Sequence, residues 1–198
     1  MAISIRTATL DDMASLMDTN LRCLPENYGI RYYLYTLVTW PELSKVAVDP
    51  AGRVVGYVLA KIEDERDAKK RHGHVTSVAT LDSYRKHGLA TKLMRASMRS
   101  MVEMYDAKYV SLHVRQTNRA AKHLYSSTLG YTEHKLDKKY YQDGEHAYEM
   151  HCKLSRASVG LPELTEESLP LRRKAEEAAA PGEPVAPAVA AAAAAATA

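Results

Sequence analysis

The feature that most constrains the fold is a strand-like run that leads through a short turn into a long amphipathic helix. Residues 74–80 (HVTSVAT) have the β-branched composition of a strand, and apolar residues recur at helical spacing from 89 to 105. The turn between them contains three consecutive basic or polar side chains, Arg85, Lys86 and His87, followed by a glycine. A strand that passes directly into a helix of this length favours an α/β protein, in which helices pack against a sheet.

The same turn is a candidate anion site. The first N–H groups of a helix have no partner within the helix, and together with the helix dipole they attract negative charge. Gly88 allows a ligand to approach the backbone closely, and Ala90 keeps the first helical turn small. The glycine spacing differs from those of the P-loop and of the Rossmann motif. On this stretch alone, a charged helix start with a tight turn explains the pattern equally well.

The patterns along the whole chain predict the element order β-α-α-β-β-β-α-β-α-β-β. Thr9 and Asp12 form a shortened capping box before the first helix, and Asn118 can cap the last one. The predicted strands cover residues 3–8, 44–48, 53–62, 74–80, 108–114, 131–136 and 147–154, and the predicted helices cover 10–24, 26–40, 89–105 and 118–129. We expect residues 1–154 to form one α/β domain with a mixed sheet. Residues 155–198 are rich in Ala, Pro and Glu and are predicted to be a mostly disordered tail.

Composition argues against several other classes of protein. The net charge of +3 is too small to indicate nucleic-acid binding. Cys23 and Cys152 lie far apart and match no zinc or disulfide spacing, so we expect free thiols in a reducing compartment. His72 and His74 form a pair, but two histidines without a further ligand are weak evidence for a metal, and none is expected. We also expect neither a secretory signal nor a membrane-spanning segment.

Longer motifs resemble a known family. The stretch "RKHGLA" resembles the Q/R-x-x-G-x-G/A pyrophosphate motif of the GNAT acetyltransferases, and "NRAAKHLYSSTLGY" resembles that family's second coenzyme-contacting segment. The predicted element order is also that of the GNAT fold, and the resemblance covers residues 3 to about 154. Within the family, the blocks "CLPENYGIRYYLY", "AKYVSLHVRQTNRAA" and "KKYYQDGEHAYEM" are similar to the catalytic subunits of N-terminal acetyltransferase A complexes.

The resemblance implies acetyl-CoA as the co-substrate. It assigns the pyrophosphate to the backbone of the turn, the acetyl carbonyl to backbone N–H groups of the preceding strand, and the pantetheine arm to Asn118. The coenzyme-binding residues implied in this way are Val78, Ala79, Arg85, Lys86, His87, Gly88, Leu89, Ala90, Asn118 and Tyr125. Val78 and Ala79 are expected to pack as ordinary strand residues whether or not their N–H groups contact the acetyl carbonyl.

The resemblance also implies catalytic roles for a direct transfer to an amine, with help from a general base. Glu26, in the loop between the first two helices, is the leading base candidate through a water, and a solvated surface acid is the alternative. His113 is the second candidate because an imidazole titrates near neutral pH, and a hydrogen-bonded sheet histidine is its alternative. Arg115 is expected to orient Glu26 or its loop, or to be a surface cation. Tyr125 is expected to protonate the leaving thiolate, or to be a core aromatic.

The acceptor implied by the resemblance is the α-amine of a protein N-terminus, and His74 is expected to order water near the base. The two walls of the family's peptide slot correspond to Leu24, Pro25 and Tyr28 on one loop and to Tyr140 and Tyr141 on another. A narrow slot favours small first residues, such as those exposed after removal of Met.

The implied partners are nascent polypeptide N-termini, a large helical-repeat auxiliary subunit on the apolar face of the first two helices, and the ribosome through that subunit. No membrane contact and no direct nucleic-acid contact are expected. The expected location is the cytoplasm, with the nucleus left open. Two alternatives also stay open: a GNAT enzyme acting on lysine side chains or small amines, and a non-catalytic acyl-CoA-binding scaffold.

Overall fold

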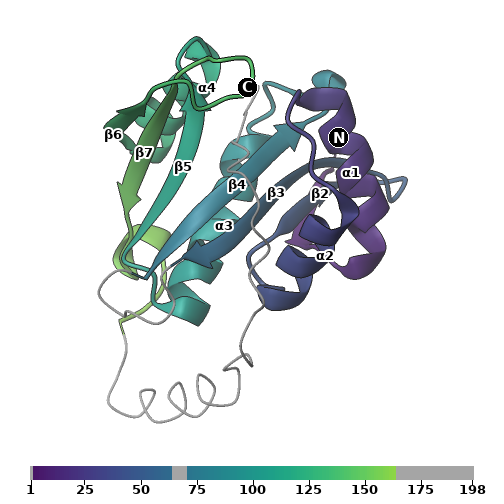
Figure 1. The fold of residues 1–198 in the computed structure, drawn as a ribbon. Helices are drawn as coiled ribbons and strands as arrows, with labels where there is room; N and C mark the ends of the chain where they lie inside the picture. Colours follow the sequence, from purple (N-terminus) through teal and green to yellow (C-terminus); the bar gives the residue numbers. More distant parts are fainter. Residues whose placement is uncertain (1, 64–70, 164–198) are drawn as a thin grey trace.

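A computed structural model describes residues 2–63 and 71–163 of the chain (Figure 1). The strands are β1 (Ser4–Thr7), β2 (Lys45–Val48), β3 (Val54–Glu63), β4 (His72–Thr80), β5 (Tyr109–Arg115), β6 (Thr132–Asp137) and β7 (Ala147–Lys153). The α-helices are α1 (Met13–Cys23), α2 (Ile30–Thr39), α3 (Leu89–Tyr105) and α4 (Arg119–His123). The order of these elements confirms the predicted α/β order.

The strands form one seven-stranded mixed sheet in the order β1-β2-β3-β4-β5-β7-β6. Neighbouring strands are antiparallel except β4 and β5, which are parallel and are joined through α3. Their pairing covers only three positions and ends at Val75 and Leu112. Beyond this point the two strands separate toward their carboxyl ends, as Figure 1 shows. We call this opening the β4–β5 fork.

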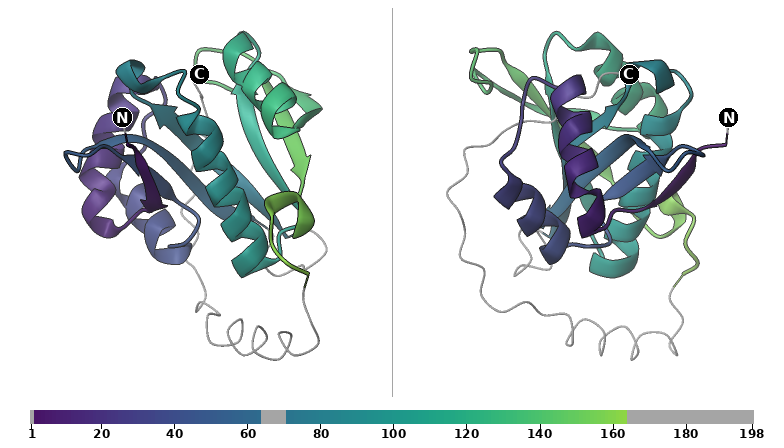
Figure 2. Two further views of the ribbon diagram at one scale, coloured as in Figure 1. Left: turned by 180° about the vertical axis from the view of Figure 1, so that it is seen from behind. Right: turned by 90° about the vertical axis from the view of Figure 1, so that its right-hand side faces the viewer.

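Helices cover both faces of the β2–β4 part of the sheet (Figure 2). Residues 57–60 of β3 alternate between two clusters: Val58 and Ala60 lie in the cluster that includes α3, and Tyr57 and Leu59 lie in the cluster that includes α1 and α2. A strand buried on both sides has an almost continuous apolar sequence, and β3 (VVGYVLAKIE) has this character. The faces of β4 near the fork are therefore held between two packed layers.

Both predicted helix caps are present. Thr9 and Asp12 form the capping box in front of a 3-10 turn that leads into α1, and the Asn118 side chain accepts a hydrogen bond from Ala121 N–H at 3.0 Å. The last helix differs from the prediction, because α4 continues after His123 as a π-helical turn, Leu124–Thr128. Among the helices that the structure describes, none has the length and apolar character needed to cross a membrane.

The chain continues to pack beyond the predicted domain end at Leu154. A 3-10 turn, Ala157–Val159, follows, and Leu161 is buried in the core that includes α3. The apolar residues after Leu154 are too few to show a period, so the sequence pattern did not indicate this packing. The rest of the predicted tail, 164–198, lies outside the described residues.

Candidate active site

A pocket of about 170 Å³ lies at the turn between β4 and α3. Its lining residues come from the end of β4, the turn, the start of α3 and the π-helical turn after α4, and are Thr80, Tyr84, Arg85, Lys86, Gly88, Leu89, Ala90, Thr91 and Leu124. Thr80 ends β4, and Leu124 belongs to the segment that follows β5. The pocket therefore bridges the two arms of the β4–β5 fork at its wide end.

The backbone of the turn is shaped to face an anion. Lys86 and Gly88 both adopt positive φ, 62° and 71°, and the first bond within α3 is donated by Lys92 N–H to Gly88 O at 3.1 Å. The N–H groups of residues 89–91 thus have no acceptor within the helix. A Cβ atom added to Gly88 would meet no protein atom within 4 Å, so the space beside it is open.

The basic side chains of the turn differ in how they lie relative to the pocket. The Arg85 guanidinium is held by Asp82 at 2.6 Å and donates to Thr80 O at 3.3 Å. Lys86 lines the pocket, whereas His87 is exposed with its Nδ1 3.4 Å from Tyr84 O and is not among the lining residues. Charge at this site therefore comes from Lys86 and Arg85 more than from His87.

The Val78 region of β4 presents a backbone donor to the fork. Leu81 N–H donates to Val55 O at 2.9 Å, on the β3 side. Because the N–H groups of a strand alternate between its two edges, Ala79 also directs its N–H toward β3, and Val78 directs its N–H toward the fork. Of the two residues expected near the acetyl carbonyl, Val78 is therefore the one whose donor faces the opening.

The loop between α1 and α2 is anchored on β4 at a β-bulge. The register of β3 and β4 shifts between Leu59 and Ala60, which leaves Thr76 as the extra residue of β4. Tyr28 Oη–H donates to Thr76 O at 3.2 Å, and the Tyr32 hydroxyl lies 3.1 Å from Thr76 Oγ1. The bulge thus supplies a carbonyl and a hydroxyl that fix the start of α2.

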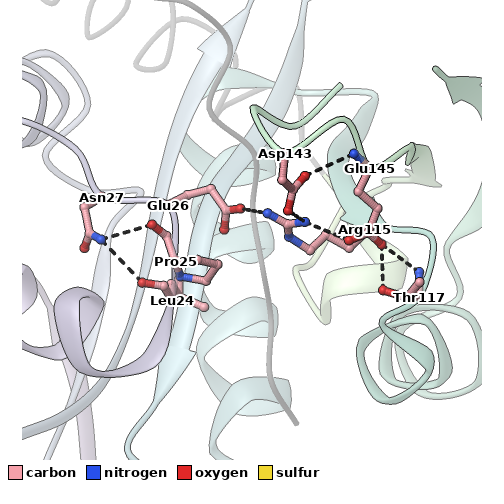
Figure 3. A network of polar contacts seen from close by, with 8 residues as sticks. All are labelled: Leu24, Pro25, Glu26, Asn27, Arg115, Thr117, Asp143 and Glu145. Atoms are coloured by element: carbon pink, nitrogen blue, oxygen red, sulfur yellow. Dashed lines mark hydrogen bonds and ion pairs between the residues drawn. The ribbon is translucent and has the colours of Figure 1, made fainter. Parts of the chain in front are cut away.

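The residues of the first predicted slot wall are unequally exposed. Leu24 and Tyr28 are buried in the cluster beneath α1 and α2, and Pro25 is exposed. The Asn27 amide donates to the carbonyl oxygens of Leu24 and Pro25, at 3.5 and 3.1 Å, and this closes the loop into a turn (Figure 3). Tyr28 therefore supports the fold whether or not it also contacts a peptide.

Arg115, at the end of β5, connects this loop with the β6–β7 loop (Figure 3). It pairs with Glu26 through Nη2, and with Asp143 and Glu145 through Nη1 at 2.7 Å each, and its guanidinium lies 3.9 Å from the centre of the Tyr141 ring. We call these five residues the Arg115 cluster. Burial acts to lower the pKa of Arg115, but the hydrogen bonds to the three carboxylates raise it well above its usual value. One cation among three carboxylates leaves the cluster with an excess of negative charge.

His113 lies two residues earlier on the same face of β5. Its ring stacks on Tyr140 at 4.3 Å, and its Nε2 is 3.3 Å from Asp137 Oδ2 on β6. Its Nδ1 is buried and has no hydrogen-bond partner in the described part of the chain, and the same is true of Glu26 Oε2. Each of the two base candidates thus has one engaged atom and one buried acceptor that lacks a donor.

His74, on β4 just before the apex of the fork, is held as a neutral imidazole. Its Nδ1 lies 2.8 Å from Ser111 Oγ, and its ring centre is 5.8 Å from that of His113. Burial lowers the pKa of His74 to about 3, against the opposing influence of Glu63. A neutral imidazole with one nitrogen bound to Ser111 retains a single ring nitrogen for a water molecule, which is compatible with the expected ordering role.

Tyr125 lies in the π-helical turn, and its ring is fully buried. Its hydroxyl has no hydrogen-bond partner among the described residues, and burial raises the pKa of Tyr125 well above its usual value. The hydroxyl therefore stays protonated and lacks an acceptor. π-Helical turns occur frequently at functional sites.

Two sets of potential metal ligands occur in the described part of the chain and share Glu149: His134 with His151, and His113 with Asp137. In each set a histidine already lies at hydrogen-bonding distance from a carboxylate, 2.8 Å for His151–Glu149 and 3.3 Å for His113–Asp137. The structure therefore accounts for both sets without a cation.

Several residues of this site were not found from the sequence. Asp143 and Glu145 complete the Arg115 cluster, Asp137 and Ser111 contact the two histidines, and Thr80 lines the pocket. Thr80 could have been found, because it directly precedes the motif turn. The others depend on which strands are neighbours and in which register, and no local pattern gives that information.

The chain is similar in sequence to one family of enzymes and similar in structure to solved members of it. The model of the acetyltransferase (GNAT) family matches residues 13–131. The chain is 52% identical over 165 residues to the N-terminal acetyltransferase A complex catalytic subunit ard1 of Schizosaccharomyces pombe, over 83% of this chain and 93% of that protein. It is 55% identical over 148 residues to the N-terminal acetyltransferase A complex catalytic subunit NAA10 of Arabidopsis thaliana, over 75% and 76% of the two chains. A crystal structure of the NatC complex bound to Gag peptide and CoA contains a similar chain, with a TM-score of 0.72 and 26% identity over 78% of this chain and 100% of that one.

Proposed function

The chain belongs to the acetyltransferase (GNAT) family, and on that premise we propose that it is the catalytic subunit of an N-terminal acetyltransferase complex of the A type. It transfers the acetyl group of acetyl-CoA to the α-amine of protein N-termini. The observation that carries this proposal is the β4–β5 fork, which has at its wide end a pocket beside the start of α3, and near its apex His113, whose Nδ1 is buried without a partner in the described part of the chain.

The reaction needs no metal and no covalent enzyme intermediate. The neutral amine attacks the thioester carbonyl carbon, the C–S bond breaks, the amine loses a proton to a base, and the coenzyme leaves as a thiolate that takes up a proton. An α-amine has a pKa of about 7.7–8.0, so a useful fraction is neutral near pH 7 and a modest base suffices. Val78 N–H, directed into the fork, stabilises the oxyanion that forms on the carbonyl.

The leaving thiolate is the natural acceptor for the Tyr125 proton. The Tyr125 hydroxyl is buried, protonated and without a partner among the described residues. A sulfur atom at the end of the pantetheine arm would provide the missing acceptor. Tyr125 is thus the general acid of the proposed reaction, and the pocket lined by the neighbouring Leu124 supports the approach of the coenzyme along this segment.

The acceptor site suits a short, positively charged peptide end. The excess negative charge of the Arg115 cluster attracts an α-ammonium group, and Glu26 Oε2 is a buried acceptor without a donor. We take Tyr28 and Tyr141, both buried and one beside each loop, as the walls of a narrow acceptor site. We therefore propose that small first residues, exposed co-translationally after Met removal, are preferred, because a narrow site rejects larger ones.

The proposed auxiliary subunit would bind α2. Ile30, Leu34 and Val38 recur every four residues and so lie on one face of the helix, and they are between 45% and 61% exposed. Leu21 on α1 is also exposed, at 65%. An exposed apolar stripe of this kind fits a helical-repeat partner, through which the complex would reach the ribosome in the cytoplasm.

The decisive experiment is mass spectrometry of peptide mixtures incubated with the full chain and acetyl-CoA, with and without the co-expressed auxiliary subunit. Peptides that begin with Ser or Ala and contain an internal Lys distinguish the two kinds of amine. Acetylation at the α-amine is expected. Acetylation confined to the Lys side chain, or to neither amine under both conditions, would contradict the proposal.

A further inference from the structure

Asp137 is the carboxylate that holds one nitrogen of His113. It lies at the end of β6, which is separated from β5 by β7, so the contact spans two strand pairings. His113 follows Leu112, the last β5 residue that pairs with β4, and therefore lies beside the apex of the fork. Stacking on Tyr140 fixes the plane of the ring, and Asp137 fixes its rotation within that plane.

The chemistry of the pair determines which nitrogen carries the proton. Asp137 also binds Lys135 at 2.5 Å, and that contact, followed by the one to His113, outweighs burial and lowers the pKa of Asp137. An ionised carboxylate can only accept a hydrogen bond. The hydrogen atom between the two groups therefore belongs to His113 Nε2, and in the neutral imidazole Nδ1 carries the lone pair.

The second ring nitrogen of His113 is unusual in its surroundings. Nδ1 of His113 is buried and has no partner in the described part of the chain. A buried acceptor without a donor is costly, typically by about 1–3 kcal/mol, so a ligand that supplies an N–H or an O–H group is favoured there. Burial lowers the pKa of His113, which keeps the ring neutral and Nδ1 available near pH 7.

We propose that Asp137 is a positioning residue, which keeps the proton of His113 on Nε2 so that Nδ1 accepts the proton of the substrate amine, directly or through one water molecule. This inference rests on the proposed function. The arrangement parallels that of other enzymes in which a carboxylate holds one nitrogen of a histidine and the other nitrogen acts as the base. The proton moves from the amine nitrogen to Nδ1 as the C–N bond forms, and the resulting imidazolium is stabilised by the Asp137 carboxylate.

Kinetics of three variants of the full chain test this role. Asp137→Asn keeps the shape but removes the charge, and its amide can donate to Nε2 and so favour the wrong tautomer. We expect kcat to fall by about 100-fold with acetyl-CoA affinity unchanged. Asp137→Glu should restore part of the rate. Glu133→Gln, an exposed acid on the same strand that pairs with Lys122, is the matched control and should behave as wild type.

The pH profile gives a readout that a purely structural role would not move. The groups that face His113 from the surrounding elements are Glu63 on β3, His74 on β4, Asp137 on β6, Tyr140 on the β6–β7 loop and Glu149 on β7. Since Asp137 raises the pKa of His113 against the dominant effect of burial, its loss must lower that pKa further. The acid limb of kcat/KM should therefore move to lower pH in Asp137→Asn and stay in place in Glu133→Gln.

The tautomer itself can be observed in the nitrogen-15 spectrum of the histidine side chains, with His113 assigned by its disappearance in His113→Gln. A wild-type ring protonated on Nε2, and a changed ring in Asp137→Asn, are the expected results. A ring protonated on Nδ1 in wild type, or an Asp137→Asn variant with wild-type rate and pH profile, overturns the inference. In that case the wild-type chain would still acetylate peptide N-termini, whereas failure of the proposed function would leave wild type itself inactive on them.

Discussion

At the scale of single residues, Gly88 offers the clearest separation of binding from folding. Its φ is +71°, and an added Cβ would meet no protein atom. Gly88→Ala should therefore cost about 1–2 kcal/mol of stability through backbone strain alone, and should also weaken acetyl-CoA binding by placing a methyl group in the pocket. Gly52→Ala is the matched control, because Gly52 has φ +81° and equally open surroundings in the β2–β3 turn.

The measurements are the unfolding midpoint and the calorimetric affinity for acetyl-CoA. Both variants should unfold at similarly lowered temperatures, and only Gly88→Ala should lose affinity. Wild-type affinity in Gly88→Ala, or an equal loss in Gly52→Ala, would show that the pyrophosphate does not bind at this turn.

His74 should make the chain sensitive to acid. Its pKa is about 3 in the folded chain, because of burial, and about 6.5 in an unfolded chain. Between these values the unfolded chain binds the extra proton, so the stability contribution is complete above about pH 6.5 and is lost as pH falls toward about 3. His74→Gln, which can still bond Ser111, should lose less unfolding free energy than wild type between about pH 7.5 and about pH 5. Equal losses in the two proteins, measured by urea unfolding, would contradict this assignment.

A contact could be predicted from the sequence only where its residues lie close together along the chain. The caps at Thr9 and Asn118 and the open turn at Gly88 involve residues within a few positions of one another, and their patterns are local. The contact of Asp137 with His113 depends instead on β7 lying between β6 and β5. That pairing is decided by the packing of the whole sheet.

At the scale of elements, the π-helical turn after α4 is a local structure that the sequence pattern missed. Apolar spacing over 118–129 fits an α-helix, and the change at Leu124–Thr128 shifts the helical phase by too little to alter that pattern. The element order was predictable because each strand or helix has its own period. The divergence of β4 from β5 was not, because the position at which two strands stop pairing leaves no mark in the residue spacing of either strand.

The π-helical turn leads to a prediction for the residue that it presents. Tyr125→Phe removes a buried hydroxyl that has no partner among the described residues, so the folded chain should be no less stable than wild type. Without the proton donor, kcat should fall by about tenfold or more while acetyl-CoA affinity is kept. Tyr131→Phe is the matched control, because that hydroxyl is also buried without a partner in the described part of the chain.

Rates should be measured at saturating peptide, together with thermal unfolding. The control variant should keep the wild-type rate. If Tyr125→Phe keeps it as well, the thiolate takes its proton from solvent, and Tyr125 is a core aromatic.

At the scale of the whole molecule, the Arg115 cluster connects two loops that belong to different parts of the fold. Glu26 belongs to the loop between α1 and α2, and Asp143 and Glu145 belong to the loop between β6 and β7. The exposed stripe of α2 lies on the helix that this first loop leads into. A partner bound to the stripe would therefore change the position of Glu26, and with it the charge and width of the acceptor site, by a shift of populations.

The auxiliary subunit should accordingly alter which N-termini are acetylated. Initial rates on a Ser-starting and an acid-starting peptide, with and without the partner, measure the effect, and the Ser-starting peptide should gain most in the complex. Val38→Glu should abolish co-purification of the partner, because it introduces a charge into the apolar stripe, whereas Met104→Glu on α3, also an exposed apolar position, should not.

In the complex, Glu26→Gln keeps the shape of the loop and removes its charge, so the rate on the Ser-starting peptide should fall by about tenfold or more if Glu26 takes part in proton removal. A near-normal rate for Glu26→Gln, alongside a large loss in Asp137→Asn, would assign the base to His113 alone and leave Glu26 with the placement of the loop.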